Sequence, residues 1–279
     1  KGGLPSIIFS NYKNVDRIIK LPRKPFSDLS GYLKGWLQLQ GRKYDLVINV
    51  DKNSSSGRLS TRFSRGKRKI FGELPEEDLW KEEHRAHFAK GPVCTFRSHM
   101  KKLGYTPETD KFPFMDLKLS PQELSAGNQL LKEMGVDGSK TIALFTYATG
   151  AKCYSEAWWN DFYERLRKEL PEYQFVEVLP VENISQLSFR LPSFYSKDVR
   201  EIGSFIANTA LFIGADSGIT HLASAVGTPT IALFSVTKEI KYRPYHNNST
   251  SLNTRRMEEN ELGALLRKAL KPKVAEPLV

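Results

Sequence analysis

Residues 211–237 read LFIGADSGITHLASAVGTPTIALFSVT, and this stretch decides the fold. It begins with an apolar run that ends at Gly214, which is typical of a buried β-strand. Asp216-Ser217-Gly218 then predicts a tight turn, and small residues continue as a helix. Gly227-Thr228-Pro229 ends that helix before a second apolar run at residues 230–234. The order strand, helix, strand indicates a parallel α/β sheet.

The turn between the first strand and the helix predicts a phosphate site. Asp216 or Ser217 can cap the helix, and Gly218 has no Cβ, so a ligand can approach the backbone closely. The N–H groups and the dipole at a helix start favour an anion, and ligands of open parallel sheets bind at the carboxyl ends of the strands. His221 lies about one helical turn beyond Ser217 and can donate to a phosphate oxygen. The alternative is a purely structural histidine.

Strands and helices alternate along the rest of the chain. We expect strands at residues 6–9, 17–21, 44–50, 69–71, 141–145 and 174–179. We expect helices at residues 29–39, 95–103, 155–170, 199–208 and 258–270, and one in the second half of residues 53–64. The alternation predicts parallel sheets with crossover helices.

A helix with strong start signals separates the two halves of the chain. Ser120 is a suitable N-cap, Pro121 occupies the first helical position, and Glu123 completes a capping box. Gly135 ends this helix, and a turn-rich segment follows. We therefore expect two domains, at residues 1–135 and 136–279.

The pattern D-S-G-x-x-H-x-A-x-A-x-G-T-P-x-x-A-L-F-x-x-T, from Asp216 to Thr237, resembles the donor-site signature of glycosyltransferase family 9. That family contains the ADP-heptose:lipopolysaccharide heptosyltransferases. Ser235 stands where the family usually has glycine, and Pro244 matches a proline further downstream. The resemblance implies a GT-B-like fold, in which two Rossmann-like domains face a cleft. It places the nucleotide-sugar donor on the second domain and the acceptor on the first.

A second motif, TYATGAKCYSEAWW at residues 146–159, resembles the family's loop after the first strand of its second domain. Thr149, Gly150 and Lys152 occupy that loop, and the resemblance implies that they bind the donor. A lysine at a strand end can bind a diphosphate as a point charge, whereas the alternative is a solvated surface lysine. Tyr154 stands where the family commonly has tryptophan. Glu182, after the next strand, is the nearest candidate for the family's acidic contact to the donor nucleoside, and the alternative is an exposed glutamate.

The first half resembles the family's acceptor domain over residues 44–72, where a strand, a polar loop and a basic helix follow one another. The resemblance implies that Lys52, Arg58 and Arg62 bind an anionic acceptor, namely phosphorylated lipid A at the inner membrane face. The basic residues near them are Arg65, Lys67, Arg68 and Lys69. A solvated basic face is the alternative.

The family's proposed catalytic base is an aspartate in a Gly-Asp pair after the first strand of its first domain. No such pair occurs near Lys1, and the sequence begins without Met. We therefore expect the first βα unit of the acceptor-side domain, and the base with it, upstream of Lys1. Asp51, at the end of a strand in the same domain, is the fallback.

Composition limits the classes of function. The chain has 42 Lys+Arg against 31 Asp+Glu, a net charge of +11, which attracts polyanions. We found no apolar run that would span a bilayer and no signal peptide, so we expect a cytoplasmic protein, peripheral to the inner membrane. Two distant cysteines and the lack of an Asp-x-Asp motif predict a site without metal.

The resemblance implies an inverting transfer of heptose, or a similar sugar, from a nucleoside-diphosphate sugar to an anionic lipopolysaccharide core acceptor. ADP-heptose is the expected donor, and no cofactor is expected. One alternative is a non-catalytic protein of the same fold that binds sugar nucleotides or anionic glycans. Epimerases that share the GT-B architecture are another. A nucleic-acid-binding protein finds no support, because the basic residues lack interleaved aromatic residues.

Overall fold

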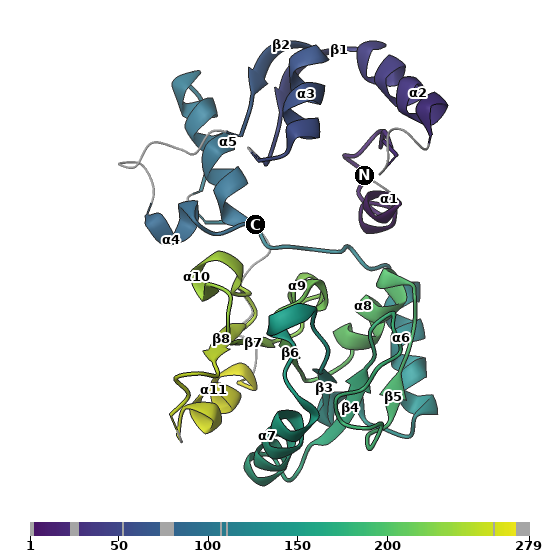
Figure 1. Ribbon diagram of the computed structural model, residues 1–279, viewed down its shortest axis with the longest axis vertical. Helices are drawn as coiled ribbons and strands as arrows, with labels where there is room; N and C mark the ends of the chain where they lie inside the picture. Colours follow the sequence, from purple (N-terminus) through teal and green to yellow (C-terminus); the bar gives the residue numbers. More distant parts are fainter. Residues whose placement is uncertain are drawn as a thin grey trace. The chain divides into compact units, whose positions relative to one another are not determined.

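The computed structural model describes residues 3–22, 28–51, 53–72, 81–106, 108–109, 111–258 and 260–271. The chain forms two compact units that divide between Pro113 and Phe114 (Figure 1). The sequence placed this boundary at Gly135, after the helix with the capping box, and that prediction was wrong. The helix, α6 (Pro121–Glu133), belongs to the second unit because it packs on α8 (Val199–Ala207).

The second unit contains a six-stranded parallel sheet in the order β5-β4-β3-β6-β7-β8. Its strands are β3 (Thr141–Phe145), β4 (Gln174–Val178), β5 (Ser193–Phe194), β6 (Leu211–Ala215), β7 (Thr230–Phe234) and β8 (Thr250–Asn253). All residues of β3, β6 and β7 are buried. Their continuous apolar runs follow from this position, because helices cover a parallel sheet on both faces.

Alternate residues of each strand face opposite sides of the sheet. On one side, Ile142, Leu144 and Ile213 pack against α7 (Glu156–Glu169) and α11 (Glu261–Ala269). Trp159 and Leu166 are the fully buried side chains that α7 contributes. The strand order reverses direction between β3 and β6, and in open α/β sheets ligands bind beside such a point.

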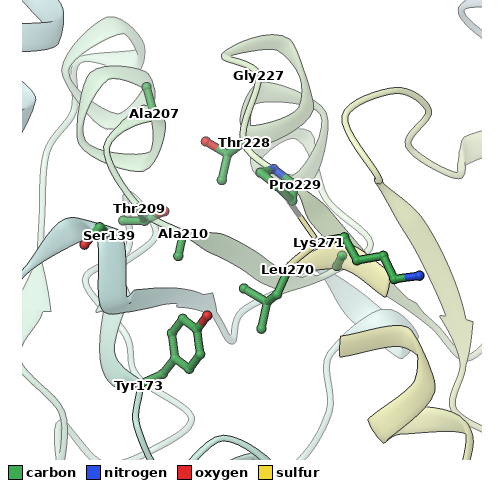
Figure 2. Close-up of a pocket in the computed structure, with 11 residues that line it drawn as sticks. Ser139, Tyr173, Ala207, Thr209, Ala210, Gly227, Thr228, Pro229, Leu270 and Lys271 are labelled. Carbon is green, nitrogen blue, oxygen red and sulfur yellow. The ribbon is translucent and has the colours of Figure 1, made fainter. Parts of the chain in front are cut away.

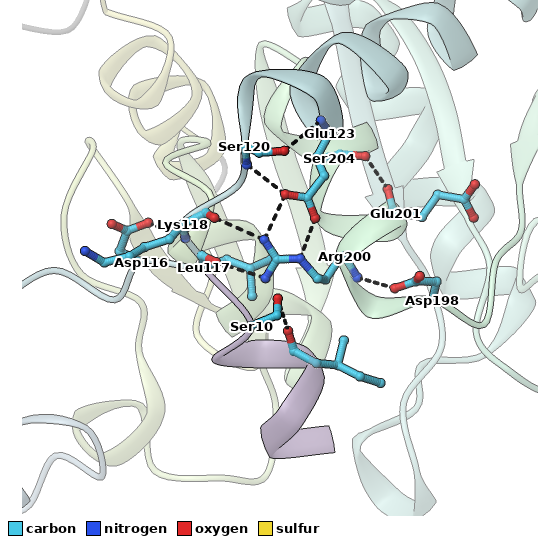
Figure 3. Close-up of polar contacts among 11 residues, drawn as sticks. Ser10, Asp116, Leu117, Lys118, Ser120, Glu123, Asp198, Arg200, Glu201 and Ser204 are labelled. Carbon is cyan, nitrogen blue, oxygen red and sulfur yellow. Dashed lines mark hydrogen bonds and ion pairs between the residues drawn. The ribbon is translucent and has the colours of Figure 1, made fainter. Parts of the chain in front are cut away.

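An ion pair between a buried arginine and a partly exposed glutamate fixes the start of the second unit (Figure 3). Arg200 on α8 forms a salt bridge with Glu123 on α6 and donates to the carbonyls of Leu117 (3.2 Å) and Lys118 (3.0 Å). Glu123 also completes the predicted capping box with Ser120, whose N–H donates to Glu123 Oε2 at 2.7 Å. The helices approach closely because Gly127 has no side chain; a Cβ there would lie 2.2 Å from the Ser204 carbonyl oxygen.

The first unit contains a two-stranded parallel sheet of β1 (Lys43–Ile48) and β2 (Arg65–Ile70), joined by α3 (Ser55–Phe63). Its other helices are α1 (Leu4–Ile8), α2 (Leu29–Gln40), α4 (Glu82–Arg85) and α5 (Lys90–Lys102). Ser54 caps α3 by accepting from the Gly57 N–H at 3.1 Å. No helix in the described ranges is long and apolar enough to cross a bilayer.

Two predictions for the first unit were wrong. Residues 6–9, expected as a strand, lie mostly in α1, since Pro5 in the first turn has a backbone angle that favours a helix. Residues 17–21, also expected as a strand, pair with no strand among the described residues. An apolar, β-branched run needs a neighbouring strand to become part of a sheet.

Candidate functional site

The two motifs singled out from the sequence meet at the carboxyl edge of the second unit's sheet. Strands β3 and β6 are neighbours and pair Phe145 with Gly214, so the loops that follow them emerge side by side. Lys152 Nζ donates to the Asp216 carbonyl oxygen at 2.9 Å and lies 3.6 Å from Asp216 Oδ2. An ammonium group 64 residues away in sequence is thereby held at the turn that precedes α9 (Gly218–Ala225).

The carboxylate of Asp216 is buried and engaged on two sides. Besides Lys152, it accepts a hydrogen bond of 2.6 Å from Thr237 Oγ1, the last residue of the motif. This hydroxyl comes from the segment after β7, so Asp216 connects the loops that follow three neighbouring strands. We expected Asp216 or Ser217 to cap α9, and neither capping bond is present: Ser217 occupies the N-cap position without a side-chain cap hydrogen bond.

The start of α9 is open. Gly218 is exposed, and apart from its chain neighbours and the backbone of α9 no atom lies within 4 Å of where its Cβ would be. The first N–H groups of a helix have no partner within the helix, and the side chain of Ser217 does not supply one here. Lys152 and this helix start therefore present positive charge at one place, as an anion site requires.

His221 lies on α9, one turn beyond Ser217, and is half-buried. Burial lowers the pKa of its imidazole, the charge of Lys152 lowers it further, and the carboxylate of Asp216 opposes both. The ring is therefore neutral at pH 7 and carries one N–H donor. It can offer a ligand one hydrogen bond without adding charge.

Tyr154 joins the loop of Lys152 to the last strand of the sheet. Its hydroxyl lies 2.9 Å from Thr254 Oγ1, just after β8. Burial raises the pKa of the phenol, hydrogen bonds to Thr254 and Ser235 lower it, and the charge of Asp216 raises it. Thr254 could not be singled out from the sequence, because its neighbours form no motif.

The remaining predicted donor residues lie on the same edge but make fewer contacts. Thr149 and Gly150 are exposed in the turn before Lys152, and Gly150 has a positive φ of 62°. Glu182 is exposed in the loop after β4, and the contacts of the described residues do not join it to Lys152 or Asp216. In the part of the chain that the structure describes, no three His, Cys, Asp or Glu side chains form a group that could hold a metal ion.

The predicted acceptor residues lie in the first unit. Arg58 and Arg62 are exposed four residues apart on α3, and Lys52 lies outside the described residues. Two lysines of the surrounding basic cluster bind groups of the first unit itself. Lys67 Nζ lies 2.7 Å from Asp45 Oδ1, and Lys69 Nζ donates to the Arg62 carbonyl at 2.7 Å.

Asp51, the fallback for the catalytic base, is exposed just after β1. Its Oδ1 accepts from the Asn53 N–H at 2.9 Å, which orders the turn before α3.

A cavity of about 260 Å³ lies at the other edge of the second unit's sheet (Figure 2). Its walls include Ser139, Thr209 and Thr228, which precede β3, β6 and β7, together with Leu270 at the end of α11. The amino ends of the strands form this edge, so the cavity is separate from the Lys152–Asp216 site.

Part of the chain is similar to a known protein family. The profile of glycosyltransferase family 9 (heptosyltransferase) matches residues 197–268, which include the turn at Asp216 and helix α9. The chain is 50% identical over 48 residues to lipopolysaccharide heptosyltransferase 3 of Escherichia coli, a match that spans 17% of this chain and 14% of that protein. It is 23% identical over 247 residues to lipopolysaccharide core heptosyltransferase OpsX of Haemophilus influenzae, covering 84% of this chain and 69% of OpsX.

The fold agrees with this match. The structure of E. coli heptosyltransferase WaaC with ADP superposes with a TM-score of 0.66 at 16% identity, covering 94% of this chain and 86% of WaaC. The GT-B-like α/β class expected from the motif is confirmed. The profile covers the turn at Asp216 and the longer relative aligns over both units, so this chain is similar to glycosyltransferase family 9 in sequence and in fold.

Proposed function

We propose that the protein is an inverting glycosyltransferase that moves a heptose, or a similar sugar, from a nucleoside-diphosphate sugar to the core of lipopolysaccharide. The observation that carries the proposal is the meeting of Lys152 with the turn at Asp216, beside the open start of α9. Asp216 and α9 lie within residues 197–268, the segment that matches the family profile, and Lys152 precedes that segment. ADP-heptose is the donor that we propose, since the WaaC structure contains ADP.

The chemistry of the site fits a departing diphosphate. In an inverting transfer, an acceptor hydroxyl loses its proton to a base and attacks the anomeric carbon, while the diphosphate leaves with growing negative charge. Lys152 and the first N–H groups of α9 would stabilise that charge, and neutral His221 would add one hydrogen bond. Thr149, Gly150 and Glu182 complete the proposed donor site.

The acceptor side is proposed from charge. Lys52, Arg58 and Arg62 precede or lie on α3, and exposed arginines attract phosphorylated glycolipids. An acceptor of this kind would bring the enzyme to the cytoplasmic face of the inner membrane as a peripheral protein. Asp51 is the residue of this unit to test first as the base.

The decisive experiment has two arms. Calorimetric titration with ADP, UDP and GDP measures the nucleotide preference, and we expect ADP to bind most tightly. Incubation with ADP-heptose and a heptose-deficient lipopolysaccharide core, followed by mass spectrometry, should show the acceptor gaining one heptose. Binding of ADP without transfer would support a non-catalytic binding protein, and the absence of nucleotide binding would refute the donor site.

A further inference from the structure

A buried carboxylate joins two loops at the edge of the sheet that carries Lys152. Glu177 lies in β4 with no solvent-exposed surface. Its Oε1 accepts from Thr146 Oγ1 at 2.5 Å, and its Oε2 accepts from Ser185 Oγ at 2.6 Å. Thr146 begins the loop that leads to Lys152, and Ser185 lies in the loop that contains Glu182.

The hydrogen bonds made by the Thr146 and Ser185 hydroxyl groups determine where their protons point. Thr146 Oγ1 accepts from the Gln186 N–H at 3.1 Å, and Ser185 Oγ accepts from the N–H groups of Leu187 and Phe189, both at 3.0 Å. A hydroxyl that accepts from an N–H still has one proton to donate. In both residues the carboxylate of Glu177 receives that proton, so both of its oxygens act as acceptors.

An ionised carboxylate satisfies this network best. Burial raises the pKa of Glu177, while the hydrogen bonds from Ser185, Thr146 and the backbone of Gln186 lower it. Two hydroxyl donors reduce the cost of keeping a charge at such a position. An uncharged amide would offer one acceptor and leave one hydroxyl proton without a partner.

The loop that Ser185 belongs to is fixed at its other end as well. Arg190 donates to Asn160 Oδ1 at 2.8 Å and to Glu164 Oε1 at 2.7 Å, both on α7. Thr146 is held by its own carbonyl, which accepts from Trp159 Nε1 at 2.8 Å. Glu177 is thus the central acceptor between two segments that are each attached to α7.

We propose that Glu177 is a positioning residue that holds the Lys152 loop and the 180–190 loop in one arrangement, so that the diphosphate and the nucleoside of one donor are bound together. This inference rests on the proposed donor site. Glu177 does not touch the donor; it acts through Thr146 and Ser185, whose hydroxyls and backbone contacts define the two loops.

The test compares Glu177→Gln with a matched pair at its partner, Thr146→Val and Thr146→Ser. Valine keeps the shape and removes the hydroxyl, whereas serine keeps the hydroxyl. We expect Glu177→Gln and Thr146→Val to weaken ADP binding about tenfold, the effect of losing roughly one hydrogen bond, and Thr146→Ser to bind as the wild type does. In the transfer assay, the donor KM should rise while the acceptor KM stays unchanged.

Hydrogen exchange gives a readout that does not depend on activity. The amides of Gln186, Leu187 and Phe189 should lose protection in Glu177→Gln, while the amides of β6 and β7 keep theirs. Equal loss of protection throughout the sheet, with an unchanged Kd for ADP in the folded protein, would overturn the positioning role and leave a stability role alone. If the wild type binds no ADP, the proposed function fails and the positioning role fails with it; if only the variants' Kd is unchanged, the positioning role alone fails.

Discussion

Replacing Lys152 by alanine tests the donor site most directly. The ammonium group is held at the turn by the Asp216 carbonyl at 2.9 Å and by Asp216 Oδ2 at 3.6 Å. The side chain is 30% exposed, so an incoming phosphate can reach it without the turn unfolding. Lysine presents three donors, so it can bind a phosphate oxygen without leaving Asp216.

The expected loss of ADP affinity in Lys152→Ala follows from the partial exposure of the Lys152 side chain. A hydrogen bond to a charged group contributes about 1.5–3 kcal/mol, and two unit charges about 4 Å apart contribute between about 1 kcal/mol in water and about 4 kcal/mol near a protein surface. We therefore expect Lys152→Ala to raise the Kd for ADP by roughly 10- to 150-fold. The lost ion pair with Asp216 should cost the fold about 1 kcal/mol or less, because Lys152 is partly solvated.

Calorimetry with ADP and with adenosine separates the phosphate contact from other effects. The affinity for ADP should fall, and the affinity for adenosine, which has no phosphate, should not change. Lys168→Ala removes the same charge from an exposed position on α7 and serves as the matched control. Equal affinity of wild type and Lys152→Ala for ADP, with Lys152→Ala fully folded, would refute the site.

Three other predictions concern the acceptor, the metal and the fold. Replacing both Arg58 and Arg62 by glutamine should raise the acceptor KM and flatten its salt dependence, while the donor KM stays constant. Replacing Lys101 and Lys102 of α5 by glutamine is the control, and equal effects on both substrates would contradict the proposed acceptor site. Transfer should survive EDTA, because Lys152 and the start of α9 provide the positive charge, and rescue of an EDTA-treated enzyme by magnesium or manganese would show a metal site instead. The hydrogen bond from Arg200 is the main cause that lowers the pKa of Glu123 from 4.5 to about 2. A lowered folded-state pKa adds stability that is complete above pH 4.5 and is lost as the pH falls towards 2, so the unfolding free energy of the wild type should drop over this range by on the order of 2 kcal/mol more than that of Glu123→Gln. Parallel pH profiles of the two proteins would argue against this role of Glu123.

The sequence predicted the central strands of the second unit closely because these strands are fully buried. The bounds of β3 and β7 agree with the expected ranges to the residue, since each is a continuous apolar run between turn residues. Strand β8 was not predicted: its sequence, TSLN, is mostly polar and lies at the edge of the sheet, where only Leu252 is buried. An edge strand of this kind lacks the apolar pattern that reveals a strand.

The sequence predicted the part of the site that lies in local motifs. Lys152 and Asp216 belong to local motifs, so their segments could be recognised, and the parallel order of β3 and β6 brings them together. Contacts made by Thr254 and Glu177 depend on which strands become neighbours, and the sequence did not give the strand order. The domain boundary was misplaced because the helix start at Ser120 and its end at Gly135 are local signals, whereas Arg200 attaches that helix from far along the chain.

The attachment of α6 also determines which part of the chain can be exchanged between relatives. A chimera that joins the acceptor half of one glycosyltransferase to the donor half of another needs a junction that separates no packed surfaces. A junction at Gly135 would pair α6 of one parent with α8 of the other, and any residue larger than glycine at position 127 would then meet the Ser204 carbonyl. Arg200 would also require a glutamate at position 123 from a different parent. A junction between Pro113 and Phe114 keeps these partners from one parent, so the proposed donor site would be transferred together with α6.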